Sequence, residues 1–406
     1  MEAGTGSLGQ GLSIGLGMAL GLRMDGIDSR VYVLMGDGEI AEGQIWEAAM
    51  AASAYRADHL VAILDRNRLQ ATGRITDRFD SGVMKEKWEA FGWRVLEIDG
   101  HDMEQIVRAL DAADEADGRP VVLDADLAGS TMGKMFEETY PERHFEMGIA
   151  EANMTSVAAG LAQTGKIPFT NSFAVFAGGR AFDQIRQTIA IGKLNVKIVG
   201  SSSGLSDFGD GATHQCVEDL AVFRAVPNMT VICPADANET AAATRAIAAY
   251  DGPVYMRLNR NPYENVTPED QPFVIGKVQM LKDGSDVVVF AAGRMVPEAL
   301  KAAEMLQDEI SVRVVNVSTI KPLDREGIIA MSEGMRGVVT AEEHNITGGL
   351  GSAVAEALCR NPKPISFVGI EDSFGCSAHN YEELLEYYGL TAAHIADAVR
   401  KEMAAI

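Results

Sequence analysis

Short apolar runs alternate with longer segments of mixed polarity along most of this chain. The run at 31–35, VYVLM, has the length and composition of a buried parallel strand rather than of a surface helix. The segment 42–55 is long enough for a helix, and a second apolar run follows at 60–64. The repeated order of strand, helix and strand predicts an α/β protein with open, mainly parallel sheets flanked by helices.

The same pattern recurs in three consecutive blocks. The expected strands are 31–35, 60–64, 94–98, 120–123, 168–176, 196–200, 230–233, 254–258, 287–291, 312–317, 337–340 and 365–369. The expected helices in the first two blocks are 42–55, 83–91, 103–113, 150–163, 181–192, 217–225 and 238–250. The stretch 261–273 is rich in Pro, Asn and acidic residues, which is typical of an interdomain linker. We therefore expect three domains, at 1–123, 124–265 and 274–406.

The first expected strand ends in a glycine-rich corner, Gly36-Asp37-Gly38. Two glycines around a carboxylate let the backbone turn and approach a charged ligand, and the free N–H groups of the following helix can bind anions. The second strand leads to Asn67, at the same edge of the sheet. A carboxylate and an amide oxygen there suit a magnesium or calcium ion that bridges a diphosphate. Gly-Asp-Gly also occurs in ordinary turns, but the E-x-x-E-G pattern directly after it favours a cofactor site.

Charge and cysteine content narrow the class of protein. The chain has 406 residues and a formal net charge of −23, which argues against nonspecific nucleic acid binding because that depends on Lys and Arg. The four cysteines form no C-x-x-C pair, so neither a disulfide framework nor a zinc site is indicated. The uncharged segment 4–21 has too many glycines and polar residues for a membrane span and lacks the basic start of a signal peptide. We expect a cytoplasmic protein that binds neither membrane nor nucleic acid.

Three motifs together resemble transketolase, a thiamine diphosphate enzyme. They are the glycine-rich corner with Asn67, the segment Gly148-Ile149-Ala150-Glu151, and the segment Asp210-Gly211-Ala212-Thr213-His214-Gln215. The resemblance covers essentially the whole chain and implies pyrophosphate, pyrimidine and C-terminal domains in that order. It also implies thiamine diphosphate and Mg²⁺ as cofactors, with Ca²⁺ able to replace Mg²⁺, and a homodimer whose two sites lie between subunits.

The resemblance assigns the metal and diphosphate to the first domain. Asp37, Asn67 and the backbone carbonyl of Leu69 would hold the metal, next to Gly36 and Gly38. Gly6 and Leu8 belong to a glycine-rich loop that in this family approaches the thiamine rings, although close helix packing explains the same glycines.

Glu151 and two aromatic residues are assigned to the aminopyrimidine ring. Thiamine catalysis requires loss of the C2 proton, and the cofactor's own aminopyrimidine removes it when a carboxyl group holds a proton on N1′. A buried Glu151 suits this role because burial favours the proton-sharing state; the alternative is a glutamate that caps the helix start. Phe173 and Phe176 would enclose the ring, with a core stripe as the alternative. Glu42 and Glu47 resemble carboxylates that link the two sites of the dimer, or are solvated helix residues.

A further group of residues is implied for a phosphorylated sugar substrate. Asp210 would bind a hydroxyl group, and His214 would contact a hydroxyl group or transfer a proton. Ser130 and Arg260 match positions that bind the terminal phosphate, with Arg257 as a nearby alternative.

Two parts of the family pattern have no counterpart in the sequence. These are the first strand with its histidine-bearing loops, and the linker with a further histidine between the first two domains, where two expected strands share the run at 120–127. Either the enzyme is shortened, or these stretches are missing only from the sequence. The segment 348–351, GGLG, precedes a helix and suits either an anion or close packing.

These features predict a transketolase that reversibly transfers a two-carbon ketol unit from a ketose phosphate to an aldose phosphate. The first alternative is an enzyme like 1-deoxy-D-xylulose-5-phosphate synthase, which decarboxylates pyruvate with the same cofactor. The second is a noncatalytic scaffold that binds the cofactor, since the histidine-bearing regions are missing.

Overall fold

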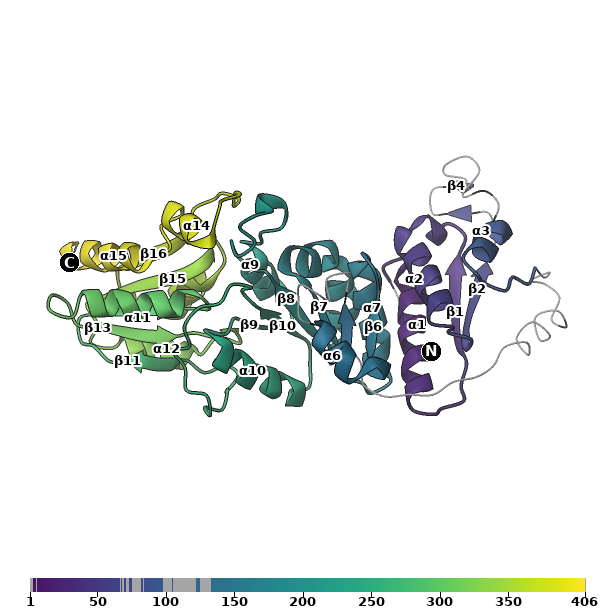
Figure 1. Cartoon of the computed structure of the whole chain (residues 1–406), viewed down its shortest axis with the longest axis horizontal. Helices are drawn as coiled ribbons and strands as arrows, with labels where there is room; N and C mark the ends of the chain where they lie inside the picture. The colour runs from purple at the N-terminus through teal and green to yellow at the C-terminus, as the bar shows by residue number, and fades with distance from the viewer. Residues whose placement is uncertain are drawn as a thin grey trace. The chain divides into compact units, whose positions relative to one another are not determined.

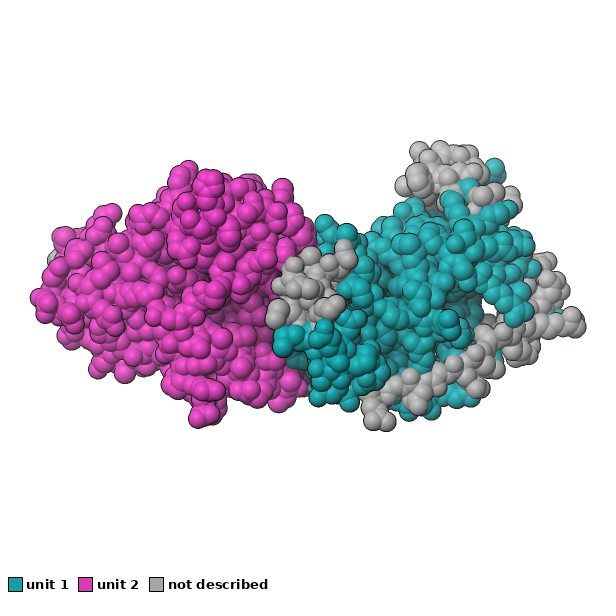
Figure 2. Space-filling view, in the orientation of Figure 1, with its two compact units in different colours: residues 1–171, 180–196 teal, residues 172–179, 197–406 magenta. Residues whose placement is uncertain are grey.

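The computed structural model describes residues 3–4, 6–65, 67, 69–70, 73–74, 82, 84–97, 104, 122–124 and 133–405. The chain divides into two compact units (Figure 2). Unit 1 comprises 1–171 and 180–196, and unit 2 comprises 172–179 and 197–406. Neither unit is therefore a single continuous segment.

Unit 1 opens with a helix and two parallel strands (Figure 1). Its first elements are α1 (Gln10–Met24), β1 (Val31–Gly36), the 3-10 helix η1 (Glu39–Ala41), α2 (Gly43–Ala54) and β2 (Leu60–Asp65). β1 and β2 pair in parallel, with Gly36 opposite Asp65. Along β1, Val33 is buried towards α1, whereas Leu34 on the other face is 72 % exposed. The prediction of a buried parallel strand is therefore right for one face of β1 and wrong for the other.

Helix α7 (Glu151–Gln163) packs against α1 at a distance that only glycine permits. An added Cβ at Gly17 would lie 2.0 Å from the carbonyl oxygen of Val157, and one at Gly160 would lie 2.0 Å from that of Ile14. Gly17 of α1 is thus used for close helix packing.

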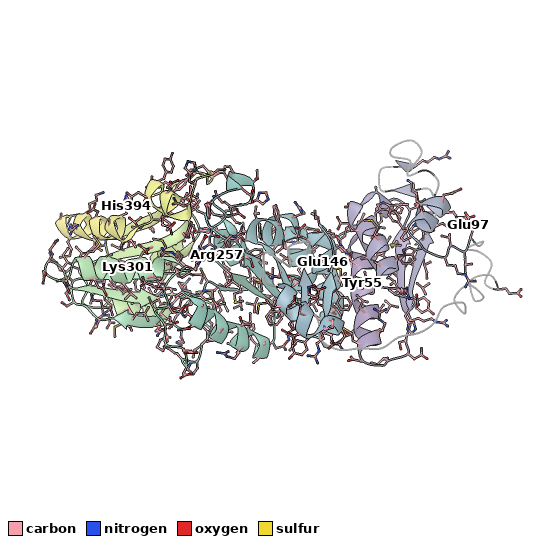
Figure 3. The ribbon with its side chains drawn as sticks, in the orientation of Figure 1. Tyr55, Glu97, Glu146, Arg257, Lys301 and His394 are labelled. Atoms are coloured by element: carbon pink, nitrogen blue, oxygen red, sulfur yellow. The ribbon has the colours of Figure 1, made fainter. Side chains whose placement is uncertain are left out.

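The other described elements of unit 1 are short. They are β3 (Leu69–Gln70), β4 (Gly73–Arg74), α3 (Met84–Ala90), β5 (Val122–Asp124), α6 (Gly133–Thr139), η3 (Pro141–Arg143), β6 (His144–Glu146), α8 (Phe182–Gln184) and the π-helix η5 (Ile185–Ala190). β5 pairs in parallel with β6 and with β7 (Phe169–Phe173), whose last residues belong to unit 2. The Tyr55 hydroxyl donates to the carbonyl oxygen of Glu146, 2.6 Å away, and so joins the end of α2 to β6 (Figure 3).

Unit 2 contains two sets of strands. The first has the order β14-β9-β10-β8, and the second has the order β11-β13-β12-β15-β16. The first set of strands and the helices between them are β8 (Lys197–Ser201), η6 (Gly211–Thr213), α9 (Asp219–Ala225), β9 (Thr230–Ile232), α10 (Ala237–Ala249), β10 (Val254–Arg257) and β14 (Thr319–Lys321). The second set of strands and its helices are β11 (Gln279–Lys282), β12 (Val287–Ala291), α11 (Met295–Met305), β13 (Val312–Asn316), α12 (Arg325–Ser332), β15 (Gly337–Asn345), α13 (Leu350–Leu358), β16 (Ile365–Ile370), α14 (Tyr381–Tyr387) and α15 (Ala392–Ala404).

The second set of strands holds the main hydrophobic core of unit 2. Every residue of β12 is buried, as expected for a central parallel strand covered on both faces. Val289, Val314 and Val339 on neighbouring strands pack with Ala299 of α11 and Ile395 of α15. β11 and β14 pair antiparallel at the edges of their sheets.

The predicted α/β class, with open, mainly parallel sheets and flanking helices, is confirmed. Some elements differ: residues 94–97 form no strand, and β7 ends at Phe173 because the π-helix η4 (Val175–Arg180) begins directly after it. β15 runs to Asn345, well past the expected end. β6, β11 and β14 were not predicted, since they are short and lack a continuous apolar run. The expected helix 103–113 lies outside the described residues, apart from 104.

The stretch 261–273 contains neither helix nor strand, as a linker would, but it is anchored to the body of unit 2. The Asp236 carboxylate accepts the N–H groups of Val266 and Thr267, each at 2.7 Å, and the Thr267 hydroxyl at 2.6 Å. Among the described residues no helix has the length and apolar character needed to cross a membrane.

Candidate active site

The glycine-rich corner lies at the carboxyl edge of β1 and β2, as predicted. The parallel register brings Asp37 next to Asp65, whose carbonyl oxygen accepts the Asp37 N–H at 3.1 Å. The side chain of Asn67 donates to Asp65 Oδ2 at 2.9 Å. Asp37 is 5 % exposed, and an added Cβ at Gly36 would meet nothing within 4 Å, so a ligand has room to approach this backbone.

The glutamate after this corner, Glu39, joins it to the glycine-rich loop. Glu39 Oε1 accepts the N–H of Gly9 at 2.8 Å, and its Oε2 accepts the N–H of Gly36 at 3.3 Å. One internal carboxylate thus already uses backbone donors from both predicted cofactor loops. Gly6 is exposed and Leu8 is 61 % exposed, at the start of α1.

Asp183 also holds this loop, through two hydrogen bonds. Its Oδ2 accepts the Ser7 hydroxyl at 2.6 Å and the Gln10 side-chain amide at 2.9 Å. Since Ser7 lies between Gly6 and Leu8, Asp183 determines where the exposed end of the loop lies.

Glu151 is buried at the first position of α7, with 1 % exposure. Arg180, at the end of η4, donates from Nη1 to Glu151 Oε2 at 2.6 Å. Glu47 on α2 belongs to the same cluster: burial raises its pKa, the Asn153 N–H group opposes this, and the charge of Glu151 raises it further. Glu42, which precedes α2, is exposed.

Unit 2 gathers the aromatic pair, the predicted histidine and an arginine. Phe173 and Phe176 are stacked, with ring centroids 6.2 Å apart and planes 13° apart. The His214 ring meets Phe176 edge-on at 5.2 Å. The Arg260 guanidinium lies over Phe173 at 5.5 Å and donates to Asp207 Oδ2 at 2.7 Å. Phe173 is buried and Phe176 is half-buried, so only the ring of Phe176 is partly accessible beside the histidine.

The predicted phosphate ligands differ in their availability. Arg257, the alternative to Arg260, is 4 % exposed and its Nε donates to both carboxylate oxygens of Asp219 at 3.0 Å, so it is part of the core (Figure 3). Arg260 is partly exposed and fits the role better. Asp210 is exposed, and Ser130 lies outside the described residues.

The glycine segment before α13 binds an anion supplied by the protein itself. Glu342 accepts the N–H groups of Leu350 and Gly351 at 2.6 and 2.8 Å. Burial raises the pKa of Glu342 to about 7, against the lowering effect of these two N–H groups. One internal carboxylate of unit 2 therefore accounts for both expectations about this segment, an anion bound at its N–H groups and close packing.

These residues fit the cofactor that the resemblance implies. The buried Asp37, the Asn67 amide and the backbone carbonyl of Leu69 would supply only oxygen donors, which suit Mg²⁺ or Ca²⁺ rather than a softer metal. In the described part of the chain no cluster of three or more His, Cys, Asp or Glu side chains could hold a metal by itself. A metal here would therefore depend on the amide, the carbonyl and the diphosphate as well.

Comparison with known proteins identifies the family. Three family models match the chain in order, the first two with an overlap: the transketolase thiamine diphosphate binding domain at 1–129, the transketolase pyrimidine binding domain at 103–265, and the transketolase C-terminal domain at 276–395. A protein of Methanocaldococcus jannaschii named putative transketolase C-terminal section is 46 % identical over 330 residues, 80 % of this chain and 98 % of that protein. The chain belongs to the transketolase family.

Two further comparisons show how it differs from other members. Human transketolase is 31 % identical over 502 aligned residues, 98 % of this chain and 80 % of the human protein. Because that alignment is longer than the 406-residue chain, stretches of the human protein have no counterpart here. A solved structure described as a split gene transketolase, inactive beta4 tetramer, is 48 % identical with a TM-score of 0.66, and covers 70 % of this chain and 92 % of that one.

Sequence reasoning missed three residues that shape this site: Glu39, Arg180 and Asp183. Glu39 was visible only as part of the E-x-x-E-G pattern. Arg180 lies between an expected strand and an expected helix, and Asp183 lies inside that helix, so no motif marked either residue; the π-helix η4 places Arg180 at Glu151, and α8 places Asp183 at the glycine-rich loop.

Proposed function

We propose that this chain is a transketolase that transfers a two-carbon ketol unit between phosphorylated sugars, with thiamine diphosphate and Mg²⁺. The observation that carries the proposal is the buried Glu151 carboxylate, beside a guanidinium and a second carboxyl group, in a chain that matches the family's thiamine diphosphate binding domain. Such surroundings are typical of an acid–base residue rather than of a helix cap.

Each predicted residue then has a defined task. Bound thiamine diphosphate supplies a nucleophilic carbon and an electron sink for the transferred unit. Glu151 would hold and return a proton at the cofactor nitrogen N1′. Phe173 and Phe176 would exclude water around the aminopyrimidine. Gly6, Leu8, Gly36 and Gly38 would contact the cofactor, and Asp37, Asn67 and the Leu69 carbonyl would hold the metal.

The substrate would be bound by residues of the pyrimidine domain. His214 would contact a sugar hydroxyl group or move a proton from it, next to Asp210. Arg260 and Ser130 would bind the terminal phosphate; Arg260 suits this because its planar donors match phosphate oxygens.

We further infer a cytoplasmic homodimer whose sites combine two subunits. The free thiols of Cys216, Cys233, Cys359 and Cys376 are consistent with a reducing compartment. The half-buried Glu47, whose pKa the charge of Glu151 raises, supports a place in a link between sites, whereas the exposed Glu42 supports the solvated alternative.

Replacing Glu151 tests the proposal. The Glu151→Gln variant should lose exchange of the cofactor C2 proton by at least about 100-fold, because an amide cannot share its proton with N1′. Its affinity for Mg²⁺ should stay near that of the wild type. Exchange at the wild-type rate would exclude the role assigned to Glu151.

Donor assays separate the enzyme classes. With a ribose phosphate acceptor, hydroxypyruvate should be turned over and pyruvate should not. Turnover of pyruvate alone would indicate an enzyme like 1-deoxy-D-xylulose-5-phosphate synthase instead.

The noncatalytic scaffold remains a second candidate because of two observations. The human protein contains stretches that this chain lacks, and the similar split-gene structure is described as inactive. Tight binding of thiamine diphosphate without any ketol transfer, measured by titration calorimetry and a coupled assay, would favour the scaffold.

A further inference from the structure

Asp210 and His214 lie on one closed loop of unit 2, residues 205–215. Gly204 and Cys216 close the base of this loop by exchanging two backbone hydrogen bonds, of 2.8 and 3.0 Å. The regular structure inside the loop is a single 3-10 turn, η6. Such a loop takes its shape from the groups that its backbone contacts rather than from a helix or a sheet.

Gln215, the last residue of the loop, is buried, with 4 % exposure. Its side-chain nitrogen lies 3.0 Å from the carbonyl oxygen of Asp207 and 3.0 Å from that of Cys376. The carbonyl oxygen of Leu205 lies further away, at 3.4 Å. Carbonyl oxygens only accept hydrogen bonds, so the NH2 group must face them. One amide therefore bonds the loop to itself and to the segment 371–380, which leads from β16 to α14 (Figure 1).

The segment 371–380 belongs to the part of the chain that matches the transketolase C-terminal domain. It makes a second hydrogen bond to the loop, from the N–H of Ala378 to the carbonyl oxygen of Phe208 at 2.9 Å. Elsewhere in the same domain, Glu343 Oε1 accepts the N–H of Leu205 at 2.8 Å. The C-terminal domain thus holds the backbone of the loop directly as well as through the amide.

Two glycines let the loop and the segment approach each other closely. An added Cβ at Gly211 of the loop would lie 2.4 Å from Ser377 Oγ. An added Cβ at Gly375 of the segment would lie 1.8 Å from Gln215 Oε1. A side chain at either position would push the loop and the segment apart, so both sides of this contact are shaped for it.

We propose that Gln215 is a positioning residue for the sugar substrate, through which the C-terminal domain fixes the loop that carries Asp210 and His214. The roles of Asp210 and His214 rest on the proposed function, whereas the contacts of Gln215 do not. Asp210 is exposed and His214 is half-buried, so a ligand can reach both, while Gln215 is buried behind them in the chain. A displaced loop should therefore weaken sugar binding and leave the proton transfer assigned to Glu151 intact.

Hydrogen–deuterium exchange of the whole chain tests this anchoring directly. Gln215→Met is close in length and shape but donates no hydrogen bond, so two carbonyl oxygens lose their partner. Amide exchange in peptides from 205–214 should become at least about tenfold faster. Gln279→Met is the matched control, because it removes a side-chain amide donor from β11, outside the loop and the segment. Wild-type exchange in Gln215→Met would overturn the proposal.

Gly375→Ala tests the same contact from the C-terminal domain. Its new methyl group would collide with Gln215 Oε1 and displace that side chain, so exchange in the loop should become faster, as in Gln215→Met. Ser373→Ala, at an exposed position of the same segment, should leave the exchange unchanged. If Gln215→Met does not fold, Gly375→Ala decides, and unchanged exchange in that variant would contradict the proposal.

Kinetics of the protein loaded with thiamine diphosphate then test the positioning role. Gln215→Met and Gly375→Ala should raise KM for a sugar phosphate donor by at least about tenfold, because substrate contacts on the displaced loop are lost. C2 proton exchange and the affinity for thiamine diphosphate should stay near those of the wild type, which general unfolding would not allow. An unchanged KM despite faster loop exchange would show a merely structural anchor and overturn the positioning role.

The two kinds of measurement separate this proposal from the proposed function. If the wild type transfers no ketol unit, the proposed function fails, and with it the role for a sugar. Hydrogen–deuterium exchange still decides whether the C-terminal domain holds the loop through Gln215.

Discussion

The hydrogen bonds of the buried His344 determine its protonation state and its tautomer. Its Nε2 accepts the N–H of Ala221 at 3.4 Å, and its Nδ1 lies 2.6 Å from the carbonyl oxygen of Asn345, to which it must donate. These bonds assign the neutral ring with the proton on Nδ1. Burial lowers the pKa of His344 to about 4, although the Asp219 carboxylate 4.0 Å away acts in the opposite direction.

This residue makes folding sensitive to acid. The unfolded chain takes up a proton on His344 near pH 6.5, whereas the folded chain does so only near pH 4. The stability that the neutral ring contributes is therefore present above pH 6.5 and is lost as the pH falls towards 4, by up to about 3 kcal/mol. His344→Gln should flatten this part of the curve of unfolding free energy against pH, measured with urea.

Glu342 also changes the unfolding free energy with pH, in the opposite direction to His344. Comparing variants with the wild type removes this contribution because Glu342 is present in all of them. Glu342 lies 3.7 Å from His344, and its pKa is raised to about 7, so its own contribution grows as the pH falls below 7. His379→Gln, at an exposed position, should retain the wild-type pH dependence. Parallel curves for His344→Gln and the wild type would contradict the argument.

At the scale of elements, the contact between α1 and α7 depends on glycine. Backbone carbonyl oxygens of each helix lie where the other helix would place a Cβ, at Gly17 and at Gly160. Such close packing holds the first residue of α7, Glu151, in a fixed place relative to the loop that precedes α1. The glycines of α1 thus support the site by packing and need not touch the cofactor.

Gly160→Ala should destabilise unit 1. The new methyl group would lie 2.0 Å from the carbonyl oxygen of Ile14, so the helices must separate, at a cost of about 1–3 kcal/mol or more. Gly43→Ala in α2 is the matched control because an added Cβ there meets nothing within 4 Å. It should stabilise the protein by about 0.4–1 kcal/mol. Thermal unfolding of both variants would decide, and an equal effect would show that the close approach is not needed.

At the scale of the whole molecule, the proposed homodimer makes a testable demand on activity. If Asp37 of one subunit and Glu151 of its partner form one site, a heterodimer of Asp37→Ala and Glu151→Gln contains one intact site. Two variants that are each inactive should therefore regain about a quarter of the wild-type activity after random exchange of subunits. Native mass spectrometry would confirm the exchange. Mixed dimers without activity would place each site within one chain.

Buried parallel strands were predicted better than edge strands or side-chain contacts. Expected strands such as 287–291 coincide with observed ones, because a buried parallel strand needs a continuous apolar run. Edge strands such as β14 were missed, since pairing on one side requires no such run. The shared edge for Asp37 and Asn67 was predictable because parallel strands end on the same side.

The sequence alone was enough to name candidate site residues, since motifs record which residue types a chemistry requires. These candidates are the glycine-rich corner, Glu151, Phe173, Phe176 and the segment ending in His214 and Gln215. Their partners could not be recognised in this way. Arg180 on Glu151, Glu39 between two loops, Asp183 on Ser7 and Asp207 on Arg260 are separated in the chain or hidden in irregular helices. Only the tertiary structure selected them, because a charge is positioned by whatever the fold brings within hydrogen-bonding distance.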